Sequence, residues 1–266
     1  MKKILCIGFG IWILVSGCAT PAPDTLFQTS TIDALLAGVY DGDITCRRLL
    51  KHGDFGIGTF DRLEGEMVIL DGTIYQIKAD GKVYKPDPEG KTPFAATCSF
   101  NPEKTISIDT GTDYKRLEAL IDGAAPNQNL FCAIKMTGQF RSMRTRSVPA
   151  QKKPYRPLKE VTPHQPEFDM KNVFGTIVGF RCPSYVNGIN VPGYHLHFIS
   201  ADRTRGGHVL SFEVANGTCD IDILDQFFLR LPGTKDVAET DFSKDRNKEL
   251  KDVERGGHDP YGGDGK

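Results

Sequence analysis

Apolar residues recur at helical spacing in four short stretches of the chain. Residues 32–39 place four of them on one face of a helix, for which Ser30 is the expected N-cap. Residues 43–52 and 114–121 follow the same spacing, and another helix is expected within residues 237–253. The sequence therefore predicts a few short helices.

The period changes to two over residues 55–100, where Asp-Gly pairs at 71–72 and 80–81 mark turns between β-prone runs. Two further runs flank Thr137-Gly138 and predict another strand pair, residues 130–136 and 139–148. In the second half, strands are expected over residues 175–181, 193–199, 209–214 and 221–231. Strands should therefore outnumber helices.

Five prolines between residues 149 and 166 argue against regular structure there and predict a linker or crossing segment. We therefore expect a mixed β-sheet domain with helices over residues 24–150 and a β domain over residues 151–232. Residues 233–266 are charged and glycine-rich and should form a partly helical tail. The predicted fold class is α/β (mixed), with two β-rich domains and a few peripheral helices.

Residues 1–18 have the features of a secretion signal. Lys2 and Lys3 precede an apolar stretch over residues 4–15, which is short for a membrane span. The following Ser16-Gly17-Cys18 resembles a bacterial lipobox, so we expect export and a lipid at Cys18, giving a periplasmic or membrane-anchored lipoprotein. The alternative is a plain signal, cleaved near Ala19 or Ala22, and a secreted protein.

Composition sets broad limits on function. The 266 residues are 39% hydrophobic and 25% charged, as in an ordinary globular protein, and the formal net charge of -1 gives no electrostatic case for binding nucleic acid. Five cysteines remain after the signal: Cys46, Cys98, Cys132, Cys182 and Cys219. Export would permit up to two disulfides, but we expect most of these residues to be buried small hydrophobes.

A cluster of histidines supplies the candidate chemistry. Residues 194–199 alternate as a half-buried strand, so His195 and His197 project from the same face. A turn-rich segment then returns His208 at the start of the next strand, and His208 shares that face if it lies opposite Ile199 in the hairpin. Such a trio leaves coordination positions open, as a catalytic metal requires.

Imidazole suits zinc, copper, iron and nickel alike, and we predict zinc as the cofactor, Zn²⁺. The alternative from the pattern alone is a set of structural histidines held by hydrogen bonds. The structural interpretation would be preferred for a single histidine, whereas three histidines within fourteen residues favour the metal site.

Seven blocks of sequence stand in the order found in one known family. They are TSTIDALL (29–36), VYDGD (39–43), HGDFGIGTF (52–60), GEMV (65–68), RTRSVP (144–149), GYHLHF (193–198) and DRTRGGHV (202–209). Together they resemble the α-acetolactate decarboxylases, and the similarity extends from residue 26 to about residue 231.

The resemblance implies a two-domain α/β carboxy-lyase, usually a homodimer, that converts 2-acetolactate to acetoin and carbon dioxide with a zinc ion. The family's zinc ligands fall on His195, His197 and His208. Its active-site glutamate and arginine correspond to Glu66 and Arg146.

Two further positions are expected to contact the substrate. Thr59 matches a pocket-lining residue of the family. The family also uses a glutamate in its C-terminal tail, for which Glu254 is the expected counterpart, with Glu239 and Glu249 as alternatives.

Taken without the family, these residues have ordinary structural interpretations. Glu66 would be a solvated strand residue, Arg146 part of a basic face and Glu254 a solvated tail charge. Two other functions also stay open. A cupin-like metalloenzyme would explain the His-x-His strand, although residues 198–201 lack the usual carboxylate. A non-catalytic zinc-binding lipoprotein would need neither Glu66 nor Arg146 near the metal.

Overall fold

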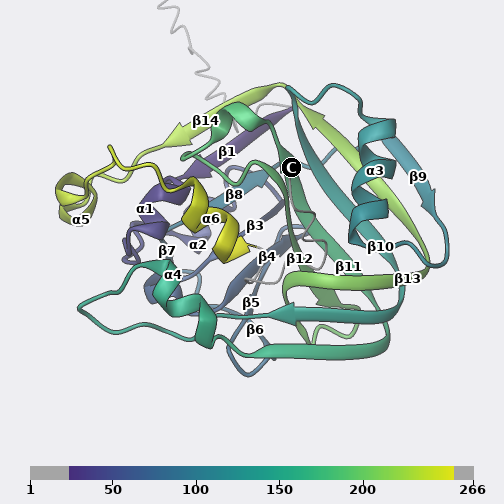
Figure 1. Ribbon diagram of the computed structural model, residues 1–266, viewed down its shortest axis with the longest axis horizontal. Helices are drawn as coiled ribbons and strands as arrows, with labels where there is room; N and C mark the ends of the chain where they lie inside the picture. Colours follow the sequence, from purple (N-terminus) through teal and green to yellow (C-terminus); the bar gives the residue numbers. More distant parts are fainter. Residues whose placement is uncertain (1–23, 255–266) are drawn as a thin grey trace, which may run out of the picture.

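The computed structural model describes residues 24–254, in which two large β-sheets pack together with short helices around them (Figure 1). The first sheet has seven strands in the order β14-β1-β8-β3-β4-β5-β6. Their bounds are β1 Thr25–Thr29, β3 Phe55–Thr59, β4 Glu66–Leu70, β5 Thr73–Ile77, β6 Val83–Tyr84, β8 Ala95–Cys98 and β14 Gln226–Arg230. All neighbours in it are antiparallel except β1 and β14, which run parallel.

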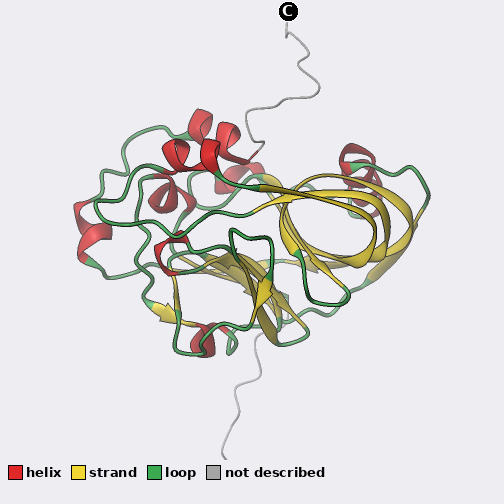
Figure 2. Cartoon of the chain, turned by 90° about the horizontal axis from the view of Figure 1, so that it is seen from below, coloured by secondary structure: helices red, strands yellow, loops and turns green. Residues whose placement is uncertain are grey.

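The second sheet has five strands in the order β10-β11-β12-β13-β9. Their bounds are β9 Lys104–Ile108, β10 Phe131–Arg146, β11 Glu167–Cys182, β12 Gly193–Ser200 and β13 Gly206–Leu224. Because β13 also pairs with β10, the sheet closes on itself, and Figure 2 shows the resulting barrel-like ring. A small third sheet joins β2 (Ile44–Thr45) to β7 (Lys91–Thr92).

The helices are short and peripheral, as expected. They are α1 Ile32–Leu36, α2 Cys46–Leu49, α3 Tyr114–Ala124, α4 Leu158–Val161, α5 Lys235–Glu239 and α6 Asn247–Glu254. Single 3₁₀ turns form at η1 Asp61–Leu63, η2 Thr162–His164 and η3 Ser184–Val186. The mixed α/β class, dominated by strands, is confirmed.

Several local predictions need correction. The N-cap of α1 is Thr31, whose hydroxyl accepts from the amide of Ala34 at 3.2 Å, because Ser30 has a positive φ of 65°. Residues 43–52 form only the single turn of α2 preceded by β2, and the tail helix is divided into α5 and α6.

The largest correction concerns Thr137-Gly138, which is not a turn. Strand β10 runs through it, and Gly138 lies opposite both Gly175 and Gly217. A Cβ on Gly138 would meet the carbonyl oxygen of Asn216 at 2.4 Å, so glycine permits close approach of two backbones there rather than a reversal of the chain.

The same continuity bears on the domain boundary that the prolines suggested. Strand β10 precedes residue 150, yet it pairs along its length with β11 and β13, which follow that residue. Strand β14 conversely completes the seven-stranded sheet. Each large sheet therefore contains strands from both sides of residues 149–166. The boundary between the two sheets does not coincide with this segment.

Two main cores hold these elements. One fills the closed sheet and the face under α3, and includes Phe140, Ile177 and Phe198. The other joins both sheets, since Phe55 and Val68 pack in it with Val178 and Phe180. The five cysteines are free and buried, which confirms their expected role as small core residues.

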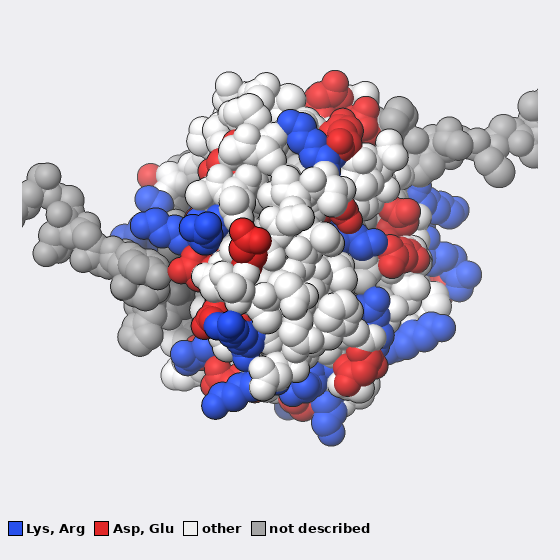
Figure 3. Space-filling view, turned by 90° about the vertical axis from the view of Figure 1, so that its right-hand side faces the viewer, with Lys and Arg blue, Asp and Glu red and all other residues white. Residues whose placement is uncertain are grey.

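One face of the molecule carries charges of both signs. On the side where α3 and β9 lie, lysine and arginine alternate with aspartate and glutamate around a wide uncharged area (Figure 3). None of the helices within residues 24–254 combines the length and apolarity needed to cross a bilayer.

The closeness of β11 and β12 generates a test of the fold. A Cβ on Gly179 would stand 2.1 Å from the carbonyl oxygen of His195, so Gly179→Ala must push β12 aside. We expect the free energy of unfolding, measured in urea, to fall by about 1–3 kcal/mol. The matched control is Gly123→Ala in α3, where a Cβ meets nothing within 4 Å. This substitution should raise the free energy of unfolding by up to about 1 kcal/mol. Equal effects of the two substitutions would contradict this packing.

Candidate active site

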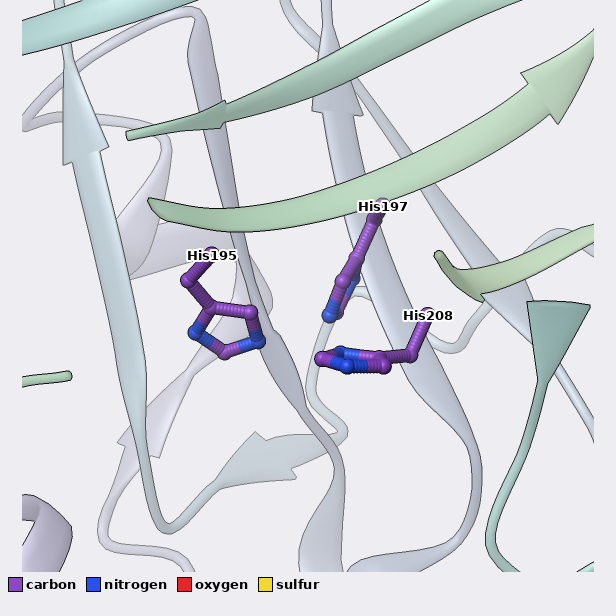
Figure 4. A group of neighbouring side chains, drawn as sticks. All are labelled: His195, His197 and His208. Atoms are coloured by element: carbon purple, nitrogen blue, oxygen red, sulfur yellow. The ribbon is translucent and has the colours of Figure 1, made fainter. Parts of the chain in front are cut away.

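Three histidine rings converge at one point on adjacent strands (Figure 4). His195 and His197 lie on the same face of β12, and His208 lies directly opposite His197 on β13. Their ring centroids are 5.0 to 5.5 Å apart, and one ring nitrogen from each lies within 4.8 Å of the other two. The expected partner of His208 was Ile199. The register is shifted by two residues, which preserves the shared face because side chains alternate with that period.

One hydrogen bond fixes the tautomer and the ring orientation of His197. Its Nδ1 lies 2.8 Å from the backbone carbonyl oxygen of Met67 on β4. Since a carbonyl oxygen only accepts, Nδ1 carries the proton and Nε2 keeps its lone pair. That Nε2 is buried and has no hydrogen-bond partner among the described residues. It is therefore oriented as a ligand atom, and the carbonyl serves as the outer partner that metal-binding histidines commonly have.

Burial keeps all three rings neutral. It lowers the pKa of His195 to about 3, with help from the positive charge of Arg146. The pKa values of His197 and His208 lie well below the ordinary value, again mainly because of burial. Neutral imidazole is the form that binds metal ions. The donor set and its protonation therefore fit a divalent metal with imidazole preference.

Glu66 begins β4 and faces this cluster. Its carboxylate oxygen lies 3.5 Å from Nε2 of His197. Burial raises the pKa of Glu66 to about 8, Arg146 opposes the shift and Glu254 adds to it. Thr59 lies directly opposite Glu66 in the pairing of β3 with β4, and its hydroxyl donates to the carbonyl of Gly65 at 2.8 Å.

Arg146 ends β10 directly opposite His208. Its guanidinium is buried, and Nη2 donates to the backbone carbonyl oxygens of Val253 and Glu254. Nη1 is buried without a partner among the described residues. One arm of the guanidinium thus holds the last residues of α6, and the other is available to a molecule in the pocket.

The end of α6 closes the site. A carboxylate oxygen of Glu254 lies 3.8 Å from Nε2 of both His195 and His208. Burial raises its pKa to about 7, against the opposing charge of Arg146. The other candidates in the tail are engaged elsewhere: Glu249 pairs with Lys159 and Arg246, and Glu239 pairs with Lys235.

Packing explains why α6 folds back. Leu250 and Val253 are buried against α1 and α4, in a cluster that includes Leu35, Leu158 and Val161. Figure 1 shows α6, in yellow, lying beside α4 and over the strands that carry the site. The tail is therefore an integral wall of the pocket.

The cavity between these groups has a volume of about 50 Å³. Apolar side chains line much of it, among them Leu63, Phe94 and Val148. Sequence reasoning missed Thr162 and Gln165, which also line it, because they lie in the proline-rich segment that was expected to be a linker. The Oε1 atom of Gln165 is buried without a partner among the described residues. A polar pair between prolines gives no sequence signal of its own.

A cavity that combines three neutral imidazoles with carboxyl and guanidinium groups is typical of an enzyme acting on a small polar molecule. Comparison with known proteins gives the particular family. The family model described as alpha-acetolactate decarboxylase matches residues 26–244. The alpha-acetolactate decarboxylase of Methanosarcina mazei is 46% identical to this chain, covering 91% of it and 84% of the relative.

A second relative of that description, from Methylococcus capsulatus, is 45% identical over 86% of this chain and 88% of its own. The crystal structure of alpha-acetolactate decarboxylase from Bacillus subtilis aligns with a TM-score of 0.84 at 39% identity, covering 87% of this chain and 99% of that one. The chain belongs to the alpha-acetolactate decarboxylase family. It is a carboxy-lyase, and the family reaction is decarboxylation of acetolactate.

These findings bear on the competing interpretations. The family match, which spans most of the chain, replaces the cupin-like alternative. A non-catalytic metal-binding protein has no need of Glu66 and Arg146 beside the histidines, yet both line the same cavity as the trio. The arrangement of the pocket therefore favours catalysis.

Proposed function

We propose that the protein catalyses zinc-dependent decarboxylation of (S)-2-acetolactate to (R)-acetoin and carbon dioxide, a step of acetoin and butanediol formation. One observation carries the proposal: three neutral imidazoles meet at a buried point that Glu66, Arg146 and Glu254 surround. The zinc ion would be held by His195, His197 and His208.

The buried Nε2 of His197, which lacks a partner among the described residues, supports a bound cation at this point. When bound, zinc supplies a Lewis acid that stabilises the negative charge left on the substrate as carbon dioxide departs. His195, His197 and His208 would supply only three donors, so the ion would remain able to act on a bound substrate.

Arg146 would orient the substrate. A planar guanidinium can contact a carboxylate through two parallel hydrogen bonds, and the Nη1 atom of Arg146 is the unpartnered donor available for this. Its grip must stay moderate, because strong binding of the departing carboxylate would stabilise the ground state more than the transition state. The carbonyl oxygens of Val253 and Glu254 share the guanidinium and so moderate that grip.

Glu66 would supply the proton that replaces carbon dioxide on carbon. It approaches the cluster from β4, with a carboxylate oxygen 3.5 Å from Nε2 of His197, so proton delivery from that side would set the configuration of acetoin. Thr59 beside it would contact the substrate, and Glu254 would cover the opposite side. The apolar walls exclude water, which strengthens each electrostatic contact inside.

The activity test uses purified protein loaded with zinc and supplied with racemic acetolactate. We expect acetoin and carbon dioxide in equal amounts. His195→Ala removes one ligand and should lose both the zinc, measured by elemental analysis, and the turnover. His164→Gln, on the exposed turn η2, is the control and should keep both. A zinc-loaded protein that leaves acetolactate unchanged would exclude this function.

The role of Glu66 is tested separately from metal binding. Glu66→Gln keeps the shape of the side chain but cannot serve as the carboxylic acid, so we expect normal zinc content and a fall in kcat of about 100-fold or more. The control is Glu64→Gln. Glu64 pairs with Lys78 at the surface, so this substitution should leave kcat unchanged. Ordinary turnover in Glu66→Gln would remove this residue from the mechanism.

Export and assembly are part of the proposal. Residues 1–18 lie outside the described residues, and we propose that they direct export, with lipid attached at Cys18 and the enzyme acting as a homodimer. Mass spectrometry of the mature amino terminus tests the leader. We expect a lipid-modified Cys18, while an unmodified start near Ala19 or Ala22 would indicate the secreted alternative instead.

A further inference from the structure

Three carboxylates from distant parts of the chain meet away from the histidine pocket. Asp24 precedes β1, Glu103 precedes β9, and Asp222 lies near the end of β13, whose beginning carries His208. One carboxylate oxygen from each lies within 4.8 Å of the other two. Like charges at this spacing repel one another, so a structural reason is needed for bringing them together.

Backbone groups hold two of these side chains in place. The Oδ2 atom of Asp222 accepts from the amide of Asn101 at 2.9 Å, and Oε2 of Glu103 accepts from the amide of Ile223 at 3.0 Å. The amide of Glu103 donates in turn to the carbonyl of Ile221. Asp222 and Glu103 therefore each have one carboxylate oxygen fixed by a backbone amide and a second oxygen left over.

The second oxygen of Asp222 is the independent sign of a missing ligand. The side chain of Asp222 is fully buried, and its Oδ1 atom has no hydrogen-bond partner among the described residues. A buried carboxylate oxygen without a donor is costly. Burial raises the pKa of Asp222 to about 6, with a further contribution from the negative charges of Glu103, Asp24 and Asp54, while the hydrogen bond from the amide of Asn101 opposes the shift.

We propose that Asp24, Glu103 and Asp222 form a binding site for a hard divalent cation of the calcium type. Carboxylate oxygens are the ligands that such ions prefer, and water completes their coordination where the site is open. Asp24 and Glu103 are the more exposed members and give access to solvent. The cation would satisfy the buried oxygen and neutralise the repulsion among the three acids.

The site would act on the fold. It would tie the start of β1, in the seven-stranded sheet, to β13 and the segment before β9, in the five-stranded sheet. A cation that binds only the folded protein stabilises it in proportion to the logarithm of its concentration above Kd. The proposal is independent of the decarboxylase chemistry, because none of these acids lines the histidine cavity.

The test uses zinc-loaded full-length protein. The buffers are freed of calcium with a chelating resin before the protein is added, so the resin does not remove zinc from the protein. Titration calorimetry with calcium chloride should give saturable binding of one ion. Thermal unfolding at ten times Kd should move up by about 3–5 °C.

Asp222→Asn and Glu103→Gln keep the acceptors for the two backbone amides but remove charge, so each should weaken calcium binding at least tenfold. Asp109→Asn, an exposed acid at the end of β9, is the matched control and should bind as the unmodified protein does. If Asp222→Asn fails to fold, Glu103→Gln carries the test alone. The proposal is overturned if calcium does not bind the unmodified protein. It is also overturned if Asp222→Asn and Glu103→Gln bind calcium with the same affinity as Asp109→Asn.

Discussion

Burial of three imidazole rings around one point is the constraint on which the rest of the site depends. A ring enclosed in this way cannot keep a positive charge, and each of its nitrogens needs either a protein partner or a ligand. The carbonyl of Met67 meets one of these needs and leaves Nε2 of His197 directed into the cluster. The three imidazoles are therefore neutral and able to bind a metal ion before any substrate is present.

Both large sheets contribute residues to this site. The closed sheet supplies His195, His197 and His208 through the pairing of β12 with β13, and β10 adds Arg146 at the same level. The seven-stranded sheet supplies Met67 and Glu66 from β4. Helix α6 then brings Glu254 over the opening, held by apolar contacts and by the guanidinium of Arg146. A displacement of either sheet would separate groups that must act within a few ångströms.

Sequence alone predicts the parts of this arrangement that follow from local alternation. The pattern over residues 194–199 fixes the shared face of His195 and His197, and the resemblance to known blocks singles out Glu66 and Arg146. It does not predict the hairpin register, since a shift of two residues leaves every side chain on the same face. The carbonyl of Met67 is equally invisible, because any residue could provide it.

Other failures have one physical origin, the dependence of glycine and polar residues on tertiary contacts. Gly138 has the sequence signature of a turn, but the close approach of β13 explains it. Gln165 lies between prolines, and only the folding of α4 and η2 over the pocket gives it a role. Asp24, Glu103 and Asp222 are too far apart in sequence for any motif to connect them.

The proposed zinc ion would be held by His195, His197 and His208. X-ray absorption at the zinc edge of the purified holoenzyme tests this assignment most directly. We expect three nitrogen ligands of imidazole type at about 2.0–2.1 Å, completed by oxygen that changes when a hydroxy-ketone analogue is added. A spectrum with sulfur at about 2.3 Å, or with fewer than three imidazoles, would contradict it.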